Sequence, residues 1–556
     1  MNKDSQTPDA EDLALQAEQK EAKAAEERRL ARAKRSQRRL RARANSTIFA
    51  RLLAAKSKYG AQTRAIIDPE NKDLTYLDLV RGGFALGSAI AKFTSRKENV
   101  GVLLPTSAGA IVTFFALQSI ARVPAMLNFT AGEKNLTSAI STAQISTILT
   151  ARKFIEMADL GDLIEALSSH ARIVYLEDLR ERLTPLDKLR AAAGPILPFL
   201  FYRPPSPKDP AVILFTSGTE GTPKGVVLSH QNILSNVEQI IAHIHLEPTD
   251  IFFNPLPVFH SFGITGGTIY PLFGGHPVVP YPSPLHVKLI PELVRRTRAT
   301  ILFATDTFLH RYMKTARQGA LASVRYAVCG AERVRDETRA MAKSKFGFNV
   351  LEGYGVTESA PVLAVNQPGD IRPGTVGKVL PGVETRLEPV EGLESGGRLY
   401  VRGPNIMQGY LMADNPGEIT PPPDGWHDTG DVVDIDGGGY MSIRGRLKRF
   451  AKLGGEMVSL AVVENCAAVV WPEFLHAAVA LPDDKKGEQI ILLTENPDPD
   501  RATLLHWAQS HGVPELAVPR KILVVDDIPV LGTGKVNYLA LQALAVERLD
   551  EEKNQS

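Results

Sequence analysis

The sequence predicts an α/β protein with a large layered N-terminal domain and a small α+β C-terminal domain. The chain has 556 residues, which is too many for one ordinary hydrophobic core. From about residue 46, short apolar runs that resemble buried strands alternate with helix-like segments. A smaller set of strands and helices begins past about residue 445.

In the large domain we expect a helix at residues 108–120 and strands at residues 99–105, 211–215, 323–328 and 349–352. In the small domain we expect helices at 459–470 and 501–511 and strands at 477–480 and 521–525. Several of the strands lead directly into loops with polar residues. Because α/β proteins bind ligands at the carboxyl ends of their strands, these loops are the candidate functional segments.

The composition is that of an ordinary globular protein, with 44% hydrophobic and 23% charged residues. The net charge of +2 gives no bias towards nucleic acid. Cys329 and Cys466 match no metal or redox spacing, so we expect two reduced, mostly buried thiols. No run approaches the roughly 18–20 apolar residues of a membrane-spanning helix, and the N-terminus lacks an apolar signal core, so we expect a cytoplasmic protein.

Residues 1–45 differ from the rest of the chain and are expected to form a helical or disordered basic arm. Residues 28–43 hold nine basic residues and no acidic one. Such a block favours a solvated arm, with contact to anionic lipid or an acidic partner as the alternative.

The apolar segment at residues 191–202 is short and is interrupted by prolines. A buried connector is the favoured interpretation. Contact with a bilayer surface and the lining of an acyl channel are the alternatives.

The strongest functional signal is the segment Thr-Ser-Gly-Thr-Glu-Gly-Thr-Pro-Lys-Gly at residues 216–225, directly after an apolar run. Glycines allow backbone N–H groups to approach an anion closely, and hydroxyl and ammonium groups add further donors. The pattern suits a nucleotide polyphosphate, and it lacks the Gly-Lys-Ser/Thr ending of a Walker loop. The candidate phosphate-binding residues are Thr216, Ser217, Gly218, Thr219, Gly221, Thr222 and Lys224.

This loop resembles the phosphate loop of the adenylate-forming superfamily, which includes acyl-CoA synthetases, acyl-AMP ligases, luciferases and peptide-synthetase adenylation domains. Four companion motifs follow in family order: Tyr-Gly-Val-Thr-Glu at 354–358, Thr-Gly-Asp at 429–431, Gly-Arg-Leu-Lys at 445–448 and Gly-Thr-Gly-Lys at 532–535. The resemblance implies an AMP-binding domain at residues 46–446, a mobile C-terminal domain at 447–545 and a tail at 546–556.

The resemblance also implies ATP and Mg²⁺ as cofactors and assigns roles to individual residues. Lys535 would be the catalytic cation of adenylation, Thr357 an α-phosphate donor and Glu358 the Mg²⁺ ligand. Further implied positions are the ribose ligands Asp431 and Arg446, the adenine-side residues Gly330, Ala331, Glu332, Tyr354 and Gly355, the gate histidine His260, the hinge Lys448, and the thiol-arm glycines Gly454 and Gly455. A lone histidine among aromatic residues is otherwise usually a core or loop residue.

Other segments are similar to the synthetase half of the bacterial bifunctional acyl-ACP synthetase/2-acylglycerophosphoethanolamine acyltransferase. They lie at residues 105–110, 126–130, 256–263, 374–382, 403–407 and 448–459. The resemblance implies a long-chain fatty acid and the phosphopantetheine of acyl carrier protein as substrates, in phospholipid acyl recycling at the inner face of the cytoplasmic membrane.

The His-x₄-Asp motif of the acyltransferase half is absent from residues 1–45, so a separate lysophospholipid acyltransferase is the implied partner. The alternatives are a fatty acyl-CoA ligase that uses CoA, a non-catalytic acyl- or nucleotide-binding scaffold, and a luciferase-like oxidase.

Overall fold

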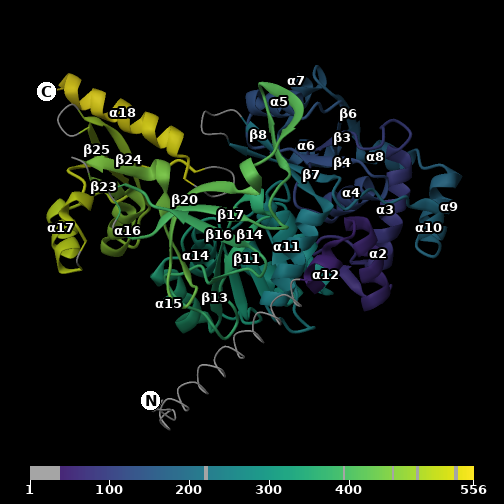
Figure 1. The fold of residues 1–556 in the computed structure, drawn as a ribbon, viewed down its shortest axis with the longest axis horizontal. Helices are drawn as coiled ribbons and strands as arrows, with labels where there is room; N and C mark the ends of the chain where they lie inside the picture. The colour runs from purple at the N-terminus through teal and green to yellow at the C-terminus, as the bar shows by residue number, and fades with distance from the viewer. Residues whose placement is uncertain are drawn as a thin grey trace, which may run out of the picture.

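The computed structural model describes residues 38–217, 223–391, 393, 395–453, 456–483, 487–511, 513–530 and 536–555. Figure 1 shows two parts of unequal size. The larger part, coloured from purple to green, holds most of the chain, and strands β23–β25 with helices α16–α18 form the smaller part at the other end. The α/β fold with a large N-terminal and a smaller C-terminal domain is confirmed.

Two large sheets, which are parallel over most of their width, form the framework of the N-terminal domain. The first has nine strands in the order β15 (Lys378–Val379), β14 (Val362–Val365), β13 (Asn349–Gly355), β12 (Tyr326–Cys329), β11 (Ile301–Ala304), β9 (Phe252–Asn254), β10 (Val278–Pro280), β1 (Arg64–Ile66) and β2 (Leu74–Thr75). The second has eight, in the order β19 (Asn415–Thr420), β18 (Gly409–Met412), β8 (Pro223–Ser229), β7 (Pro210–Ser217), β4 (Val123–Met126), β3 (Asn99–Val102), β5 (Thr147–Thr150) and β6 (Arg172–Tyr175).

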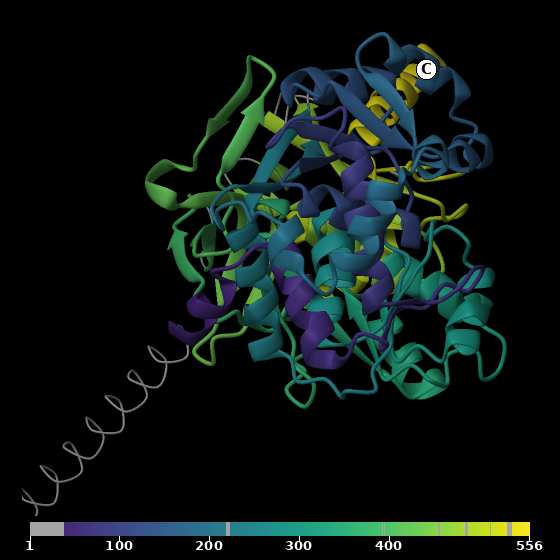
Figure 2. The same ribbon diagram turned by 90° about the vertical axis from the view of Figure 1, so that its right-hand side faces the viewer.

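Helices pack against both sheets, and those from the first half of the chain lie in front of the sheets in the side view (Figure 2). They are α2 (Ile48–Tyr59), α3 (Tyr76–Ile90), α4 (Ala108–Ser119), α5 (Glu133–Thr142), α6 (Arg152–Met157), α7 (Gly161–Ser168), α8 (Leu176–Glu181), α9 (Pro185–Ala193), α10 (Pro198–Phe201), α11 (His230–His243), α12 (Tyr270–Gly274), α13 (Leu289–Thr297), α14 (Asp306–Thr315) and α15 (Asp336–Phe346), with the π-helix η1 (Phe262–Ile269) and the 3₁₀ turn η2 (Thr357–Ser359). Helix α4 is apolar around most of its circumference and is almost entirely buried, as expected of a helix inside the core.

A four-stranded antiparallel sheet follows the two large sheets in the chain. Its strands are β16 (Glu384–Glu388), β17 (Gly397–Arg402), β20 (His427–Ile435) and β21 (Met441–Arg446), and the 3₁₀ turn η3 (Pro423–Gly425) precedes β20. Strand β21 leads through the 3₁₀ turn η4 (Leu447–Arg449) into the C-terminal domain. That domain contains β22 (Phe450–Leu453), β23 (Glu456–Ser459), α16 (Leu460–Val470), β24 (His476–Asp483), β25 (Gly487–Thr494), α17 (Arg501–Ser510), the 3₁₀ turn η5 (Glu515–Ala517), β26 (Lys521–Val524) and α18 (Tyr538–Gln555).

The helices and strands expected from the sequence are present, with ends that shift by a few residues. The largest shifts are of three residues, as at β12, which begins at Tyr326 instead of residue 323. Both cysteines are buried and free, as expected. The part of the chain that the structure describes contains no helix long and apolar enough to cross a membrane.

The expectation of a buried connector at residues 191–202 is wrong. Ile196 and Phe199 are 77% and 74% exposed, respectively. The reason is that the preceding helix, α9, packs on α3 through polar side chains, and the short α10 follows it on the surface.

Gly263 has no room for a side chain at the start of η1. A Cβ atom there would lie 2.1 Å from the carbonyl oxygen of Pro257. We expect Gly263→Ala to lower the free energy of unfolding by roughly 2–4 kcal/mol, because the backbone must shift to remove this overlap. Chemical denaturation measures the change.

The matched control for this prediction is Gly161→Ala in α7, where an added Cβ would meet nothing within 4 Å. The control should change stability by no more than about 0.5 kcal/mol. Equal stability of the two variants would contradict the packing described for Gly263.

Candidate active site

The segment with the strongest sequence signal lies between two antiparallel strands of the second sheet. Strands β7 and β8 form a hairpin in which Thr216 lies opposite Lys224. The backbone of Ser217 pairs with Pro223. Gly218, Thr219, Gly221 and Thr222 lie outside the described residues. The hairpin thus places Thr216 and Lys224 on either side of the expected phosphate-binding segment.

Tyr410 connects Lys224 to Glu358, although the three residues are far apart in the chain. The Nζ atom of Lys224 lies 5.4 Å from the centre of the Tyr410 ring. The Tyr410 hydroxyl donates a hydrogen bond of 2.6 Å to Oε1 of Glu358. Strand β18 pairs with β8, which brings Tyr410 opposite Val226. The Tyr410 side chain therefore contacts both the Lys224 ammonium group and the Glu358 carboxylate.

Asp431 forms the second polar centre of the site. It lies on β20 and is only 4% exposed. The Tyr354 hydroxyl donates to its Oδ2 atom at 2.5 Å, and Nε of Arg446 donates to Oδ1 at 3.1 Å. Burial raises the pKa of the Asp431 carboxyl, while Arg446 and the Tyr354 hydroxyl lower it. Burial and the nearby Asp431 charge raise the pKa of the Tyr354 phenol, which keeps it a neutral donor.

The start of η1 brings His260 and Thr357 into one neighbourhood. The hydroxyl oxygens of Ser261 and Thr357 lie 3.4 Å apart. The His260 ring lies 4.8 Å from the ring of Phe259, which lies 5.2 Å from that of Phe129. This side of the site therefore combines hydroxyl groups with aromatic surface.

The turn after β12 lies beside η1. A Cβ atom at Gly330 would lie 3.3 Å from the Phe262 ring. Ala331 has a left-handed backbone with φ of 72°. The Glu332 carboxylate accepts a hydrogen bond of 2.9 Å from the Thr307 hydroxyl, and burial raises the pKa of this carboxyl. Glu332 is thus bound to the start of α14 in this structure.

Gly355 ends β13, and its neighbourhood requires glycine. A Cβ atom there would lie 2.0 Å from the carbonyl oxygen of Pro361. The close approach of these two backbone segments fixes the chain between Tyr354 and Thr357. Both polar centres of the site therefore depend on this one turn.

Lys448 lies exposed in η4 between two anchored arginines. Arg446 binds Asp431 in the N-terminal domain. Arg449 binds Glu464 at 2.7 Å and stacks over Tyr538 at 3.7 Å, both in the C-terminal domain. The chain between the domains is therefore held on both sides of Lys448.

Three further expected functional residues, Gly454, Gly455 and Lys535, also lie outside the described residues. Val530 and Val536, which flank the segment that carries Lys535, pair with each other.

Tyr410 is a residue of the site that the sequence motifs did not predict. It lies three residues after the motif-bearing segment 403–407, so its position was the available signal. Its contact with Glu358 depends on the pairing of β18 with β8, which the sequence does not reveal.

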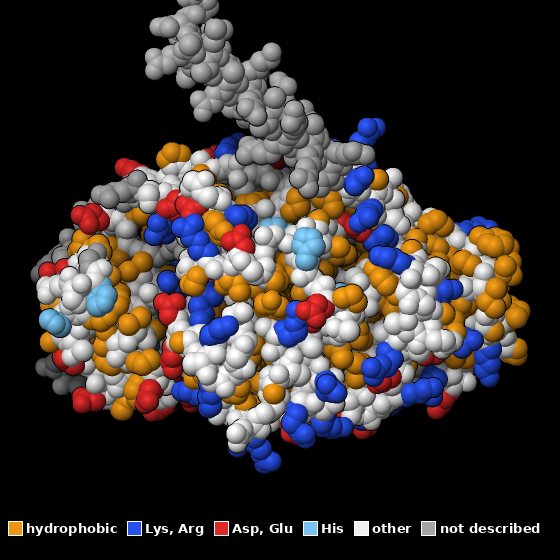
Figure 3. Space-filling view, turned by 90° about the horizontal axis from the view of Figure 1, so that it is seen from below, with side chains coloured by type: hydrophobic (Ala, Val, Ile, Leu, Met, Phe, Trp, Pro, Cys, Tyr) orange, Lys and Arg blue, Asp and Glu red, His pale blue; other side chains and the backbone are white. Residues whose placement is uncertain are grey.

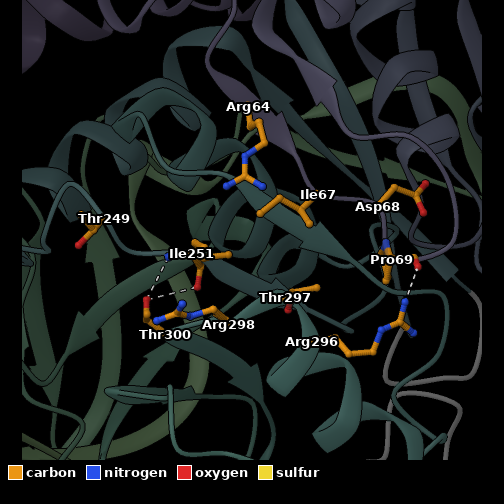
Figure 4. A pocket seen from close by; sticks show the side chains of 10 residues that line it. All are labelled: Arg64, Ile67, Asp68, Pro69, Thr249, Ile251, Arg296, Thr297, Arg298 and Thr300. Carbon is orange, nitrogen blue, oxygen red and sulfur yellow. Dashed lines mark hydrogen bonds between the residues drawn. The ribbon is translucent and has the colours of Figure 1, made fainter.

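A separate hollow of about 600 Å³ lies at the opposite edge of the nine-stranded sheet. Thr249 and Ile251 precede β9, and residues 296–300 precede β11, whereas the residues of the site follow β12 and β13. Strand β1 and the residues directly after it complete the lining. Figure 4 shows Arg64, Arg296 and Arg298 around this hollow. It is therefore distinct from the site described above.

The described residues contain no group of three or more His, Cys, Asp or Glu side chains that could hold a metal ion. Glu358 is the carboxylate that binds the Tyr410 hydroxyl, and the Tyr410 ring lies beside Lys224. A single carboxylate fits Mg²⁺, because this ion commonly binds one or two carboxylates together with phosphate oxygens and water.

The fold, the hydroxyl- and glycine-rich hairpin and the buried Asp431 define a nucleotide-binding enzyme of the adenylate-forming type. Residues 53–411 match the family model described as AMP-binding enzyme, and the chain belongs to this family of adenylate-forming acid–thiol ligases.

Its relatives include the medium-chain fatty-acid–CoA ligase of Escherichia coli strain K12, which is 29% identical over 62% of each chain. Feruloyl-CoA synthase of an Amycolatopsis species is 27% identical over 83% of this chain and 92% of its own. The ATP-bound structure of MatB from Rhodopseudomonas palustris superimposes with a TM-score of 0.76 at 26% identity, covering 90% of this chain and 99% of that one.

Tyr410→Phe removes the hydroxyl that binds Glu358 and keeps the ring beside Lys224. We expect kcat/KM for ATP to fall about tenfold or more, because a hydrogen bond to a charged group contributes about 1.5–3 kcal/mol. Pyrophosphate release measures the effect.

The control is Tyr281→Phe, which also removes a hydroxyl hydrogen bond of 2.6 Å, here to His286. This variant should keep its kcat/KM. A Tyr410→Phe enzyme with unchanged ATP kinetics would show that the hydroxyl does not position Glu358 for catalysis.

Proposed function

We propose that the protein activates a long-chain fatty acid with ATP and transfers the acyl group to the phosphopantetheine thiol of acyl carrier protein. The observation that carries the proposal is that the site contains two neighbouring polar centres. Lys224, Tyr410 and Glu358 form one, and Tyr354, Asp431 and Arg446 form the other. An enzyme that adenylates a carboxylate needs a polyphosphate site and a ribose site next to each other.

In the first half-reaction a carboxylate oxygen of the fatty acid attacks the α-phosphorus of ATP, and pyrophosphate leaves. Both reactants are anions, so positive groups and donors must neutralise the phosphate oxygens. Lys224 and the hydroxyl of Thr357 serve this purpose, together with Lys535. Mg²⁺ neutralises further phosphate charge when it is bound, and Glu358 is the residue that would hold it.

Asp431 accepts hydrogen bonds from the ribose hydroxyls in this proposal. Its two present donors, Tyr354 and Arg446, hold the carboxylate in place. Gly330, Ala331 and Glu332 form the adenine side of the pocket. His260 and its aromatic neighbours lie at the acyl side, and no general base is required because the substrate carboxylate is already ionised.

In the second half-reaction the thiol attacks the acyl carbonyl and AMP leaves. We propose that the C-terminal domain rotates about Lys448 to admit the thiol. The anchoring of Arg446 in one domain and of Arg449 in the other supports this hinge, since it confines the movable backbone to the residues between them. Gly454 and Gly455 would then leave room for the pantetheine arm.

The proposed acyl substrate rests on the aromatic surface around Phe259 and on the relative named medium-chain fatty-acid–CoA ligase. Acyl carrier protein is proposed from the motif resemblance at residues 256–263, 374–382 and 448–459. The second candidate acceptor is CoA, which appears in the names of the relatives. The proposed setting is the cytoplasmic face of the membrane, with a separate lysophospholipid acyltransferase as the consumer of the product.

Lys535→Ala tests the division between the half-reactions. Acyl-adenylate formation should fall about 100-fold or more, because the variant loses the cation that neutralises the α-phosphate. Thioester formation from supplied acyl-adenylate should stay nearly intact. Quench-flow measurement of each half-reaction gives the two rates.

The control is Lys452→Ala in β22, which should leave both rates unchanged. If the Lys535→Ala variant lost both half-reactions equally, the assignment of this lysine to adenylation alone would be wrong.

The choice of thiol is tested by offering ATP, Mg²⁺ and palmitate with equimolar holo-acyl carrier protein and CoA. Mass spectrometry of both thiols measures where the acyl group goes. We expect acylation mainly of the carrier protein. Acylation mainly of CoA would replace the proposed acceptor and leave the adenylation mechanism standing, whereas no pyrophosphate release with any fatty acid would refute the proposed acid substrate.

A further inference from the structure

Helices α9 and α10 expose an unusual amount of apolar surface. Six large hydrophobic side chains within fifteen residues are at least 40% exposed: Leu186, Leu189, Ile196, Leu197, Phe199 and Leu200. Five of the six are between 54% and 77% exposed, and Phe199 itself is 74% exposed. Contiguous patches of this kind mark interaction surfaces, whereas single exposed apolar residues do not. We call these six residues the α9–α10 patch.

Helix α9 is attached to the protein by its polar side. Asp187 is completely buried, where its carboxylate accepts hydrogen bonds from Ser88 at 2.6 Å and from Lys92 at 2.5 Å. Arg190 donates to the Ser88 hydroxyl at 2.8 Å. In an ordinary surface helix the leucines would face the core and these charged groups would face water. Here the arrangement is reversed, and Leu186 and Leu189 face outward.

The segment between the two helices is fixed just as firmly. A Cβ atom at Gly194 would lie 2.5 Å from the Phe84 ring and 2.6 Å from the carbonyl oxygen of Arg190. The Phe201 ring contacts the Phe84 ring at 6.5 Å. The patch is therefore presented by a well-packed base.

The exposed charged groups between residues 182 and 208 are of one sign, and the exposed acidic residue Glu181 directly precedes this stretch. Between residues 182 and 208 the exposed charged side chains are all basic, and they are Arg182, Lys188, Arg203 and Lys208. The one acidic residue in this stretch is the buried Asp187, which is paired with Lys92. Figure 3 shows hydrophobic side chains gathered at the end of the molecule where α9 and α10 lie in Figure 1, with basic side chains at their border.

We propose that the α9–α10 patch is a docking surface for an anionic lipid bilayer. The apolar side chains enter the boundary between headgroups and acyl chains, and the basic border meets the anionic headgroups. This pairing of an apolar face with Lys and Arg is what interfacial membrane contact requires. An apolar protein partner would explain the exposed leucines but would give no reason for the excess of basic side chains between residues 182 and 208. The inference does not depend on the proposed acid or thiol.

The test places a tryptophan in the patch of the full-length protein. Phe199→Trp is compared with Leu539→Trp on α18, since Leu539 is 69% exposed at the other end of the molecule. Vesicles of phosphatidylglycerol and phosphatidylcholine carry brominated acyl chains, which quench only a tryptophan that enters the bilayer. We expect quenching of the Phe199→Trp probe above the signal of the three native tryptophans, and none for Leu539→Trp.

This probe also separates the patch from the N-terminal basic residues, because it reports on insertion at its own position. In a second measurement, the double variant Ile196→Ser/Phe199→Ser should partition onto the same vesicles about tenfold more weakly or worse than Leu539→Ser. Pyrophosphate release by the double variant in solution should be unchanged, which verifies that it is folded.

Three results would overturn the proposal. The first is equal quenching of the two tryptophan probes. The second is equal insertion into vesicles of phosphatidylcholine alone, which would show that anionic headgroups are not needed. The third is a dimer, detected by light scattering, that the double variant abolishes, which would identify the patch as an interface between copies of this chain.

Discussion

The buried carboxylate of Asp431 is the interaction on which the site depends. A charge with 4% exposure is costly unless donors surround it, and Tyr354 and Arg446 supply them from two other strands. Those donors join the end of the nine-stranded sheet to the last strand before the C-terminal domain. One hydrogen-bonded centre therefore holds the expected ribose site in shape and determines where the interdomain connection begins.

The same centre explains how the C-terminal domain can be attached without disturbing the site. Arg446 is bound on one side of Lys448, and Arg449 is bound to Glu464 and Tyr538 on the other. Rotation about the residues between them would change few contacts within either domain. The residues proposed to bind polyphosphate and ribose belong to the large domain, so a rotation of the small domain would change which of its residues face them. A two-step ligase would benefit from this arrangement.

The α9–α10 patch shows the opposite use of a buried charge. Asp187 and Lys92 attach a helix by its polar side, although packing of Leu186 and Leu189 would remove more apolar area from water. The apolar side chains of this helix therefore remain exposed to solvent. The lost hydrophobic stabilisation would be useful if the site had to lie near a membrane, since fatty acids partition into bilayers.

Much of this protein was determined by local sequence. Apolar runs between glycine- and proline-rich turns predicted strands such as β3, β7 and β13 to within a few residues, because a buried strand needs a continuous apolar stretch. The order of five motifs indicated the family and the candidate residues Lys224, Glu358 and Asp431. What the tertiary structure decided was contact between distant segments. The Tyr410–Glu358 hydrogen bond exists because β18 pairs with β8. Ile196 and Phe199 are exposed because the preceding helix is attached through Asp187 to Ser88 and Lys92. Both outcomes depend on which strands and helices become neighbours, and residue pattern alone does not encode that choice.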